Sequence, residues 1–482
     1  MSSDIQEEQS RPRSLVPTAI GYGLMVLVTI VVFLLIRSYG ETLVAPTARE
    51  AAHAATSIQS SNILLRVLVA LVAIIVTGQM LGWVFAYLNQ PPVIGEVVAG
   101  ILLGPSLLGP EVSALVLPPS VAPYLGIIAQ LGVVLYMFLV GLELNPALLK
   151  QRAHATVATS HASILTPFIL GALLSLLLYP RVSTSDVSFT SFALFMGVSM
   201  SITAFPVLAR ILTDYRMSRT RLGALALSCA AIDDVTAWCL LAFVVGIAKA
   251  EVGQGLFVAA GAVAFIAFMF LLGRPILERV VVRWEGEAQT RVITTVVFVA
   301  LLLSSLTAEL IGIHAIFGAF LLGAVIPHDS ALARALTRQL EQVVTILLLP
   351  AFFALTGMRT RIDLLYEPWQ WLICAVIVLT AVVGKFGGTL VAGRLTGLRW
   401  RDAAILGALM NTRGLMELIV LNVGLDLHVI TPTLFAMMVL MALVTTMMTA
   451  PVVRLLNPQP ALEEAPDKIV EVGLKNLREF GE

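Results

Sequence analysis

Two aspartates stand side by side inside an apolar stretch of this chain. Asp233 and Asp234 lie between Leu222 and Lys249, and from Leu222 to Ile247 nothing else is charged. The stretch is long enough to cross a bilayer as a helix of about 20 or more residues. A charge at mid-membrane costs about 2.5–3.5 kcal/mol on insertion scales, so acids there are taken as functional.

Neighbouring carboxylates in a medium of low dielectric cannot both ionise cheaply. A cation that binds the ionised form therefore displaces a proton. Competition of this kind is sufficient to couple a flux of cations to a flux of protons. We predict that Asp233 and Asp234 bind a cation and a proton in competition.

A second polar interruption lies upstream, in GVSMSITAFPVLARIL at residues 197–212. Pro206 removes a backbone donor and frees the carbonyl about four residues back, near Ile202. A broken helix at membrane depth is tolerated only where it faces protein or a water-filled cavity. Its freed carbonyls and polar side chains are then cation ligands; Ser201 and Thr203 are candidates. The alternative is an ordinary proline kink.

A third interruption, ALMNTRGLMELIVLNVG at residues 408–424, places Asn411, Arg413 and Glu417 inside another membrane segment. Arg413 and Glu417 are four apart, so they share a face of a continuous helix and could pair. We predict a second broken helix that faces the first, with Asn411 as a possible ligand. Lys385, also inside an apolar run, either snorkels to the interface or pairs with a buried acid.

The composition places most of these elements in lipid. The chain has 482 residues, of which 58% are hydrophobic and 12% charged, against about 25% charged in soluble domains. Lys+Arg 30 against Asp+Glu 30 gives no net charge, which argues against nucleic acid as a partner. Cys229, Cys239 and Cys374 fall in apolar stretches, so we expect buried thiols and no disulfide.

We expect an all-α polytopic membrane protein with about 13–14 transmembrane helices. The apolar segments run over residues 15–36, 63–88, 92–109, 124–145, 155–179, 188–212, 221–248, 255–273, 291–310, 312–327, 341–358, 369–395, 402–424 and 431–455. With the N-terminus inside, most Lys and Arg residues fall on the inner side. Both termini are then cytoplasmic, and we expect the protein to lie in the cell (inner) membrane.

An internal repeat is visible in two pairs of short motifs. Gly100–Pro105 (GILLGP) resembles Gly318–Pro327 (GAFLLGAVIP), and Phe138–Leu144 (FLVGLEL) resembles Phe353–Arg359 (FALTGMR). In each pair the two copies are seven segments apart. Because seven is an odd number, the two copies cross the membrane in opposite orientations. Inverted repeats of this kind are a recurrent way to build secondary transporters.

Five ordered motifs together resemble the sodium/hydrogen exchanger fold, in the monovalent cation:proton antiporter-2 family. They are FLVGLELN (138–145), SITAFPVLARIL (201–212), AAIDDVTAW (230–238), GIHAIFGAFLLGAVIP (312–327) and MNTRGLMELIVLN (410–422). The resemblance covers nearly the whole chain after about residue 63. It implies an inverted-repeat antiporter with two crossed broken helices, a homodimer embedded in membrane lipid, and an elevator motion.

The resemblance also assigns roles to residues. Asp234 matches the cation and proton carrier, and Thr203 lies at the site. Asp233 matches a position that is aspartate in many electrogenic exchangers and asparagine in many electroneutral ones. Lys385 matches the lysine that pairs with this aspartate in the electrogenic members. Two-proton, one-cation exchange is therefore expected. The supporting charges of the second crossover are Arg413 and Glu417.

The resemblance further implies a division of the chain. The expected parts are a cytoplasmic N-terminus, extra helix and external loop in 1–62, a transmembrane domain in 63–456 and a short cytoplasmic tail in 457–482. Within the transmembrane domain, core helices cover about 155–248 and 369–455, and dimer-domain helices about 63–145 and 291–358.

Several alternatives stay open from the sequence. They include electroneutral K⁺/H⁺ antiport, K⁺ efflux, transport of another substrate on this fold and a passive channel. An intramembrane aspartyl protease needs two facing acids on separate helices, whereas Asp233 and Asp234 are neighbours about 100° apart on one helix. We expect a transporter and not an enzyme, with no cofactor besides the transported ions.

Overall fold

The computed structural model describes residues 15–43, 63–88, 90–118, 120–143, 153–215, 217, 220–249, 255–283, 290–327 and 330–456, and all regular structure in them is helical. The first half holds α1 (Leu15–Gly40), α2 (Ile63–Tyr87), α3 (Pro92–Leu103), α4 (Pro105–Val116), α5 (Ala122–Glu143), α7 (Ala153–Val182), α8 (Phe189–Ser201), α9 (Phe205–Asp214) and α10 (Arg221–Lys249). The second half holds α11 (Gly255–Phe268), η1 (Met269–Gly273), α12 (Arg274–Arg283), α13 (Thr290–Ile311), α14 (Ala315–Val325), α15 (Ala331–Val343), η3 (Val344–Leu348), α16 (Leu349–Arg359), η4 (Ile362–Leu364), α17 (Pro368–Val382), η5 (Val383–Gly387), α18 (Gly388–Leu395), α19 (Trp400–Met410), α20 (Leu415–Asp426) and α21 (Pro432–Leu456). The predicted tail 457–482 and the ends of the predicted segment 1–62 lie outside the described residues.

Ten helical stretches in the described ranges are long and apolar enough to cross a membrane, or twelve if two bent pairs each count as one span. The two remaining predicted segments are the shorter apolar helices α8 and α14. The chain is therefore a multi-pass membrane protein. The predicted segment 92–109 falls on one of these bent pairs, in which the chain bends by 65° between α3 and α4.

The outer surface is apolar, as expected for helices that face lipid. Leu64, Val72 and Trp83 on α2 are 71%, 62% and 73% exposed. Of the three cysteines, Cys229 and Cys374 are buried but Cys239 is exposed, so the prediction of a buried thiol was wrong at Cys239. In an apolar membrane helix the outward face is as apolar as the inward one, so composition alone cannot separate them.

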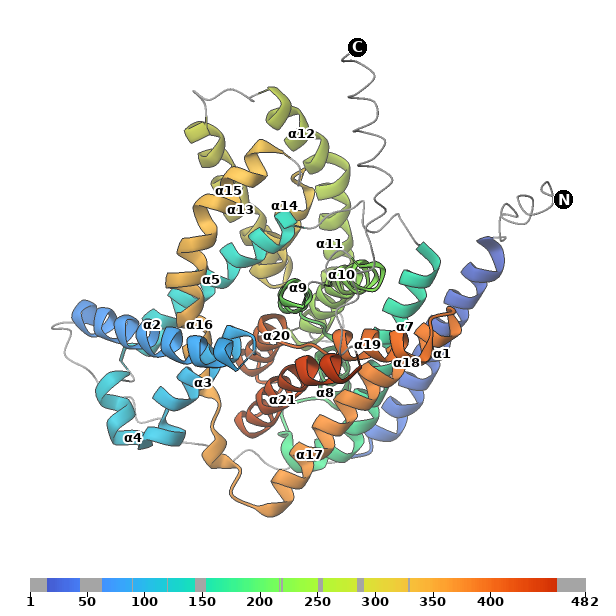
Figure 1. Ribbon diagram of the computed structural model, residues 1–482, viewed down its shortest axis with the longest axis horizontal. Coiled ribbons are helices and arrows are strands. Elements are labelled where there is room, and N and C mark those ends of the chain that lie inside the picture. Colours follow the sequence, from blue (N-terminus) through green and yellow to red (C-terminus); the bar gives the residue numbers. More distant parts are fainter. Residues whose placement is uncertain are drawn as a thin grey trace, which may run out of the picture.

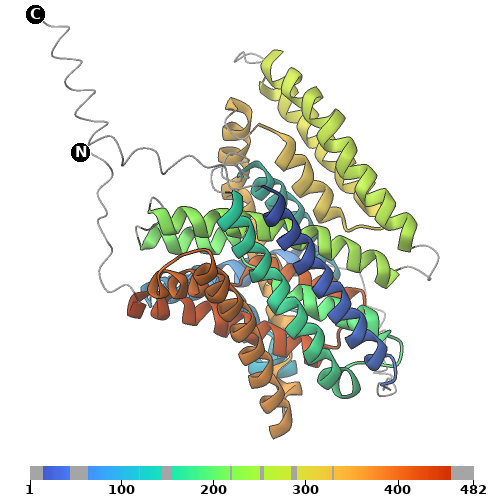
Figure 2. The ribbon, with the colours of Figure 1, turned by 90° about the vertical axis from the view of Figure 1, so that its right-hand side faces the viewer.

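The helix α1 lies alongside α7, at the edge of the bundle (Figure 2). The rings of Phe33 and Phe168 meet across this contact with their centroids 5.9 Å apart. The buried helices α8, α20 and α21 lie near the centre of the molecule (Figure 1). The interruptions predicted from the sequence lie at the end of α8 and at the start of α20.

The repeated motifs meet one another across the bundle. Helix α3 packs on α16, where a Cβ added to Gly357 would lie 2.5 Å from the carbonyl carbon of Gly100. Helix α5 packs on α14, where a Cβ added to Gly323 would lie 2.9 Å from the Cα of Gly141. The first motif of one repeat thus contacts the second motif of the other repeat, and the reverse also holds. At both contacts the two backbones lie too close together for any residue with a side chain.

Candidate functional site

The first predicted break is present between α8 and α9. Helix α8 ends at Ser201, and Ile202 adopts an extended conformation with φ −72° and ψ 138°. Helix α9 resumes at Phe205, so Pro206 falls in its first turn. Proline has no N–H for the carbonyl of Ile202. The chain is therefore a broken helix at this point rather than a kinked one.

The second break lies between α19 and α20, which are bent by 45° relative to each other. Its extended segment meets the first break directly. The backbone N–H of Ala204 donates to the carbonyl of Thr412 at 3.0 Å. The hydroxyl of Thr203 lies 3.2 Å from the carbonyl oxygen of Met410, at the end of α19. The two interrupted helices therefore cross at their unwound segments.

Asp233 lies on α10 beside this crossing and is completely buried. Ser160 donates to its Oδ1 at 2.6 Å. Its Oδ2 accepts from Ser163 at 2.7 Å and from Thr203 at 2.9 Å. The same oxygen lies 2.9 Å from Nζ of Lys385, and neither side chain of this ion pair is exposed. Three hydroxyl groups and one ammonium group thus contact the carboxylate of Asp233.

Lys385 reaches Asp233 from a π-helical turn, η5, within the otherwise α-helical stretch of α17 and α18. Its ammonium group also donates to the carbonyls of Ser163, at 3.0 Å, and Ser201. Ser201 is the last residue of α8, where unpaired carbonyls and the helix dipole favour a positive charge. The snorkelling alternative is excluded because Lys385 is 0% exposed.

Arg413 supplies a second positive charge to the same helix end. Its two terminal nitrogens donate to the carbonyls of Ser199 at 2.8 Å and Met200 at 2.6 Å. It also pairs with Glu417 at 2.8 Å, and both side chains are completely buried. The hydroxyl of Thr446, on α21, donates to the carbonyl of Arg413 at 2.8 Å. The backbone of the second break is thereby fixed to α21.

Asp234 differs from its neighbour in its surroundings. It is 3% exposed, and its Oδ1 is buried without a hydrogen-bond partner in the described part of the chain. The side-chain oxygen of Asn411, in the second break, is buried and unpartnered in the same residues. A buried oxygen without a donor costs about 1–3 kcal/mol. The carboxylate oxygen can bind a cation or a proton, and the amide oxygen can bind a cation.

The other predicted ligands, all in the first break, differ in the contacts that they form. Thr203 contacts Asp233 and not Asp234 in the hydrogen bonds described above. The hydroxyl of Ser201 lies within hydrogen-bond distance of the carbonyls of Ile164 at 2.9 Å and Gly197 at 2.7 Å. Its own carbonyl accepts from Lys385. The hydroxyl hydrogen and the carbonyl oxygen of Ser201 are therefore both used, whereas Ile202 keeps the carbonyl that Pro206 cannot bond.

Ser160, Ser163 and Thr446 contact the site but were not found from the sequence. Ser160 and Ser163 are three residues apart on α7, so they share one face of that helix. This spacing was the one feature of the sequence that could have pointed to them. It is not sufficient, because serines in membrane helices often bond only to the backbone of their own helix. Ser175 on the same helix does so, with a hydroxyl that donates to the carbonyl of Gly171.

The chain resembles known transport proteins over most of its length. It is 44% identical over 83% of its length to a Na(+)/H(+) antiporter, NhaS4, of Synechocystis, 99% of which is covered. It is 38% identical over 83% of its length to cation/H(+) antiporter 19 of Arabidopsis thaliana, of which 51% is covered. It is 33% identical over 78% of its length to K(+)/H(+) antiporter 1 of Saccharomyces cerevisiae, of which 44% is covered. The chain thus spans about half of the plant and yeast relatives.

The fold agrees with this resemblance. The structure of the sodium proton antiporter MjNhaP1 from Methanocaldococcus jannaschii superposes with a TM-score of 0.60 at 15% sequence identity, over 81% of this chain and 96% of that one. The family profile described as "Sodium/hydrogen exchanger, transmembrane" matches residues 67–455. The chain belongs to the sodium/hydrogen exchanger family.

Proposed function

We propose that this protein is a secondary active antiporter that exchanges a monovalent cation, Na⁺ or K⁺, for protons. One observation carries the proposal. Asp234 presents a buried carboxylate oxygen without a donor in the described residues, next to a crossing of two broken helices. The adjacent Asp233 is already satisfied by three hydroxyls and Lys385. Asp234 is therefore the acid that is free to exchange ligands.

The cycle follows from the chemistry of one carboxylate. Ionised Asp234 binds a desolvated cation, with the oxygen of Asn411 and the carbonyl of Ile202 as further ligands. Protonation of Asp234 removes the negative charge and releases the cation. A cation and a proton cannot occupy this carboxylate together. If the site crosses the membrane only when it holds a cation or a proton, the two fluxes are coupled.

We propose that the exchange is electrogenic, with two protons for each cation. The ion pair of Lys385 with Asp233 offers a second place where a proton can be held, in addition to Asp234. The alternative is electroneutral K⁺/H⁺ antiport or K⁺ efflux, in which that ion pair is purely structural. Transport in liposomes that does not respond to a clamped membrane potential would exclude the electrogenic form.

We propose an elevator motion for this chain, in which core helices over about 155–248 and 369–455 move against helices over about 63–145 and 291–358. The latter set forms the contact of a homodimer. Supporting this division, both broken helices, α10 and Lys385 all belong to the first set. We further propose that the protein resides in the cell (inner) membrane with both termini cytoplasmic.

Reconstituted transport tests the function. Purified protein in liposomes is given a pH gradient, and the dequenching of a pH-sensitive dye is followed after addition of Na⁺, K⁺ or Li⁺. The proposal expects dequenching with Na⁺, K⁺ or both, and none with choline. The relatives named as Na(+)/H(+) and K(+)/H(+) antiporters make both cations necessary trials. Absence of a response to every cation, in protein that is folded and inserted, would contradict the proposal.

A further inference from the structure

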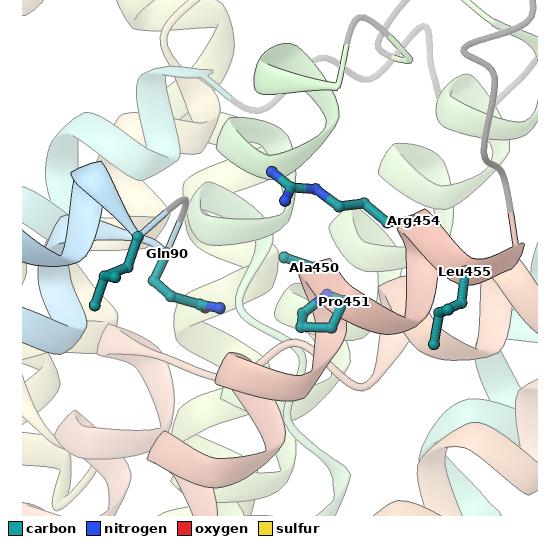
Figure 3. A pocket seen from close by; sticks show the side chains of 6 residues that line it. Gln90, Ala450, Pro451, Arg454 and Leu455 are labelled. Carbon is teal, nitrogen blue, oxygen red and sulfur yellow. The ribbon is translucent and has the colours of Figure 1, made fainter.

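A cavity of about 350 Å³ lies between the end of α21 and the connection from α2 to α3. It is lined by Leu88, Gln90, Ala450, Pro451, Arg454 and Leu455. Figure 3 shows the side chain of Arg454 reaching back over Ala450, towards the side from which Gln90 enters. The lining thus combines one full positive charge with mainly apolar groups.

Within the described residues, Arg454 has one side-chain interaction, with an aromatic ring. The guanidinium carbon of Arg454 lies 5.4 Å from the centre of the Tyr215 ring. In the ranges that the structure describes, Arg454 forms no ion pair and no hydrogen bond with another residue. Stacking on a ring uses the face of a guanidinium and leaves its N–H donors available in the plane. These donors match the oxygens of a phosphate group.

The position of the cavity coincides with the edge of the membrane. Arg454 lies in the last turn of α21, and Arg401, at the start of α19, donates to the carbonyl of Leu456. Trp400 beside it is 66% exposed, with the guanidinium of Arg394 4.8 Å above its ring. Exposed tryptophan and arginine mark the level of lipid headgroups.

The apolar side of the cavity is exposed at the molecular surface. Leu88 is 57% exposed and Leu455 is 81% exposed, so both offer a surface for an acyl chain. Gln90 closes the opposite side, because its side-chain nitrogen donates to the carbonyl of Met447 on α21 at 3.2 Å. A ligand that fits this lining has an anionic phosphate joined to an apolar chain.

We propose that this cavity binds an anionic phospholipid, with its phosphate on Arg454 and an acyl chain along Leu88 and Leu455. In the proposed orientation the lipid belongs to the cytoplasmic leaflet, where anionic lipids gather. A free phosphate ion would use the charge but not the apolar lining. The inference depends on the membrane location of the chain and not on which ions it transports.

Native mass spectrometry of the purified, detergent-solubilised protein tests this site. The protein is titrated with phosphatidylglycerol, with phosphatidylcholine and, in a third series, with glycerol 3-phosphate. Wild type is expected to retain phosphatidylglycerol in preference to phosphatidylcholine and to ignore glycerol 3-phosphate. In Arg454→Gln the retention of phosphatidylglycerol should fall about fivefold.

Two variants control the result. Arg399→Gln removes an arginine at the same end of the bundle that is paired with Asp402, and it should bind lipid as wild type does. Arg454→Lys preserves the charge and should keep most of the binding even if Arg454→Gln folds poorly. Unchanged retention of phosphatidylglycerol in folded Arg454→Gln would overturn the proposal. Retention of glycerol 3-phosphate equal to that of phosphatidylglycerol would also overturn it, in favour of a soluble phosphate site.

Discussion

Asp233 and Lys385 form an ion pair of 2.9 Å although neither side chain is exposed to solvent. The pair belongs to a larger set of contacts that stabilises the C-terminal end of α8, since Lys385 and Arg413 both donate to carbonyls there. Removal of one partner from a buried pair leaves an uncompensated charge, at a cost of about 3–5 kcal/mol.

Lys385→Ala should therefore reduce stability more than the double variant Asp233→Asn/Lys385→Ala does. In the single variant Asp233 keeps its three hydroxyl donors but loses its countercharge, whereas the double variant removes both charges. Thermal unfolding in detergent measures the three melting temperatures. Equal losses in the single and double variants would show that the charges are not coupled.

Ser160→Ala should slow transport about tenfold, because a buried oxygen of a charged group would lose its donor. Ser160 is the donor to Oδ1 of Asp233 among the described residues, at 2.6 Å. The matched control is Ser175→Ala, which removes a buried hydroxyl of the same helix that bonds only to the carbonyl of Gly171. Initial rates of exchange in liposomes compare the two, and similar rates would contradict the role given to Ser160.

Gly384→Ala should impair transport and stability, because the π-helical turn that carries Lys385 approaches α7 too closely for a side chain. A Cβ at position 384 would lie 2.9 Å from the Cα of Pro167, a backbone atom that cannot rotate away. Gly387→Ala is the control within the same turn, since a Cβ there meets nothing within 4 Å. A normal transport rate in Gly384→Ala, or an equal loss in Gly387→Ala, would contradict this explanation.

The sequence predicted those features that have a chemical cost in a membrane. Because Pro206 removes a backbone donor, the first break could be located from the sequence. Because acids are scarce in the membrane segments, few residues besides Asp233 could be predicted as the partner of Lys385. Ser160 and Ser163 could not be found, because a serine that stabilises a distant carboxylate looks like one bonded to its own helix. The bend at Gly104 and the outward direction of Cys239 depend on packing between helices, which leaves no pattern in an apolar sequence.

Arg359 connects the end of α16 to the end of α20. One of its nitrogens lies 3.0 Å from the side-chain oxygen of Asn422 and 2.8 Å from Asp426. If α20 moves against α16 in the transport cycle, these bonds must break. Arg359→Gln should then shift the equilibrium between conformations by up to about fivefold, since a partly exposed ion pair contributes about 0.2–1 kcal/mol.

The shift can be measured by cysteine accessibility. Ala129 is 1% exposed and lines a small cavity of about 50 Å³ between α5 and α20. In a variant without the three native cysteines, Ala129→Cys should react faster with a thiol reagent when Arg359→Gln is present. Arg361→Gln is the control, because Arg361 pairs with Asp363 two residues away. Equal reactivity in the Arg359 and Arg361 variants would show that the contact of Arg359 with Asn422 and Asp426 does not affect the equilibrium between conformations.

The central claim is that a cation and a proton compete for Asp234, and cation-induced proton release tests it most directly. Purified protein in weakly buffered detergent solution is mixed with Na⁺ or K⁺, and released protons are followed with a pH indicator. Wild type and the surface control Asp402→Asn should release protons in proportion to the cation bound. Asp234→Asn should release none. Proton release from folded Asp234→Asn equal to that of wild type would contradict the claim.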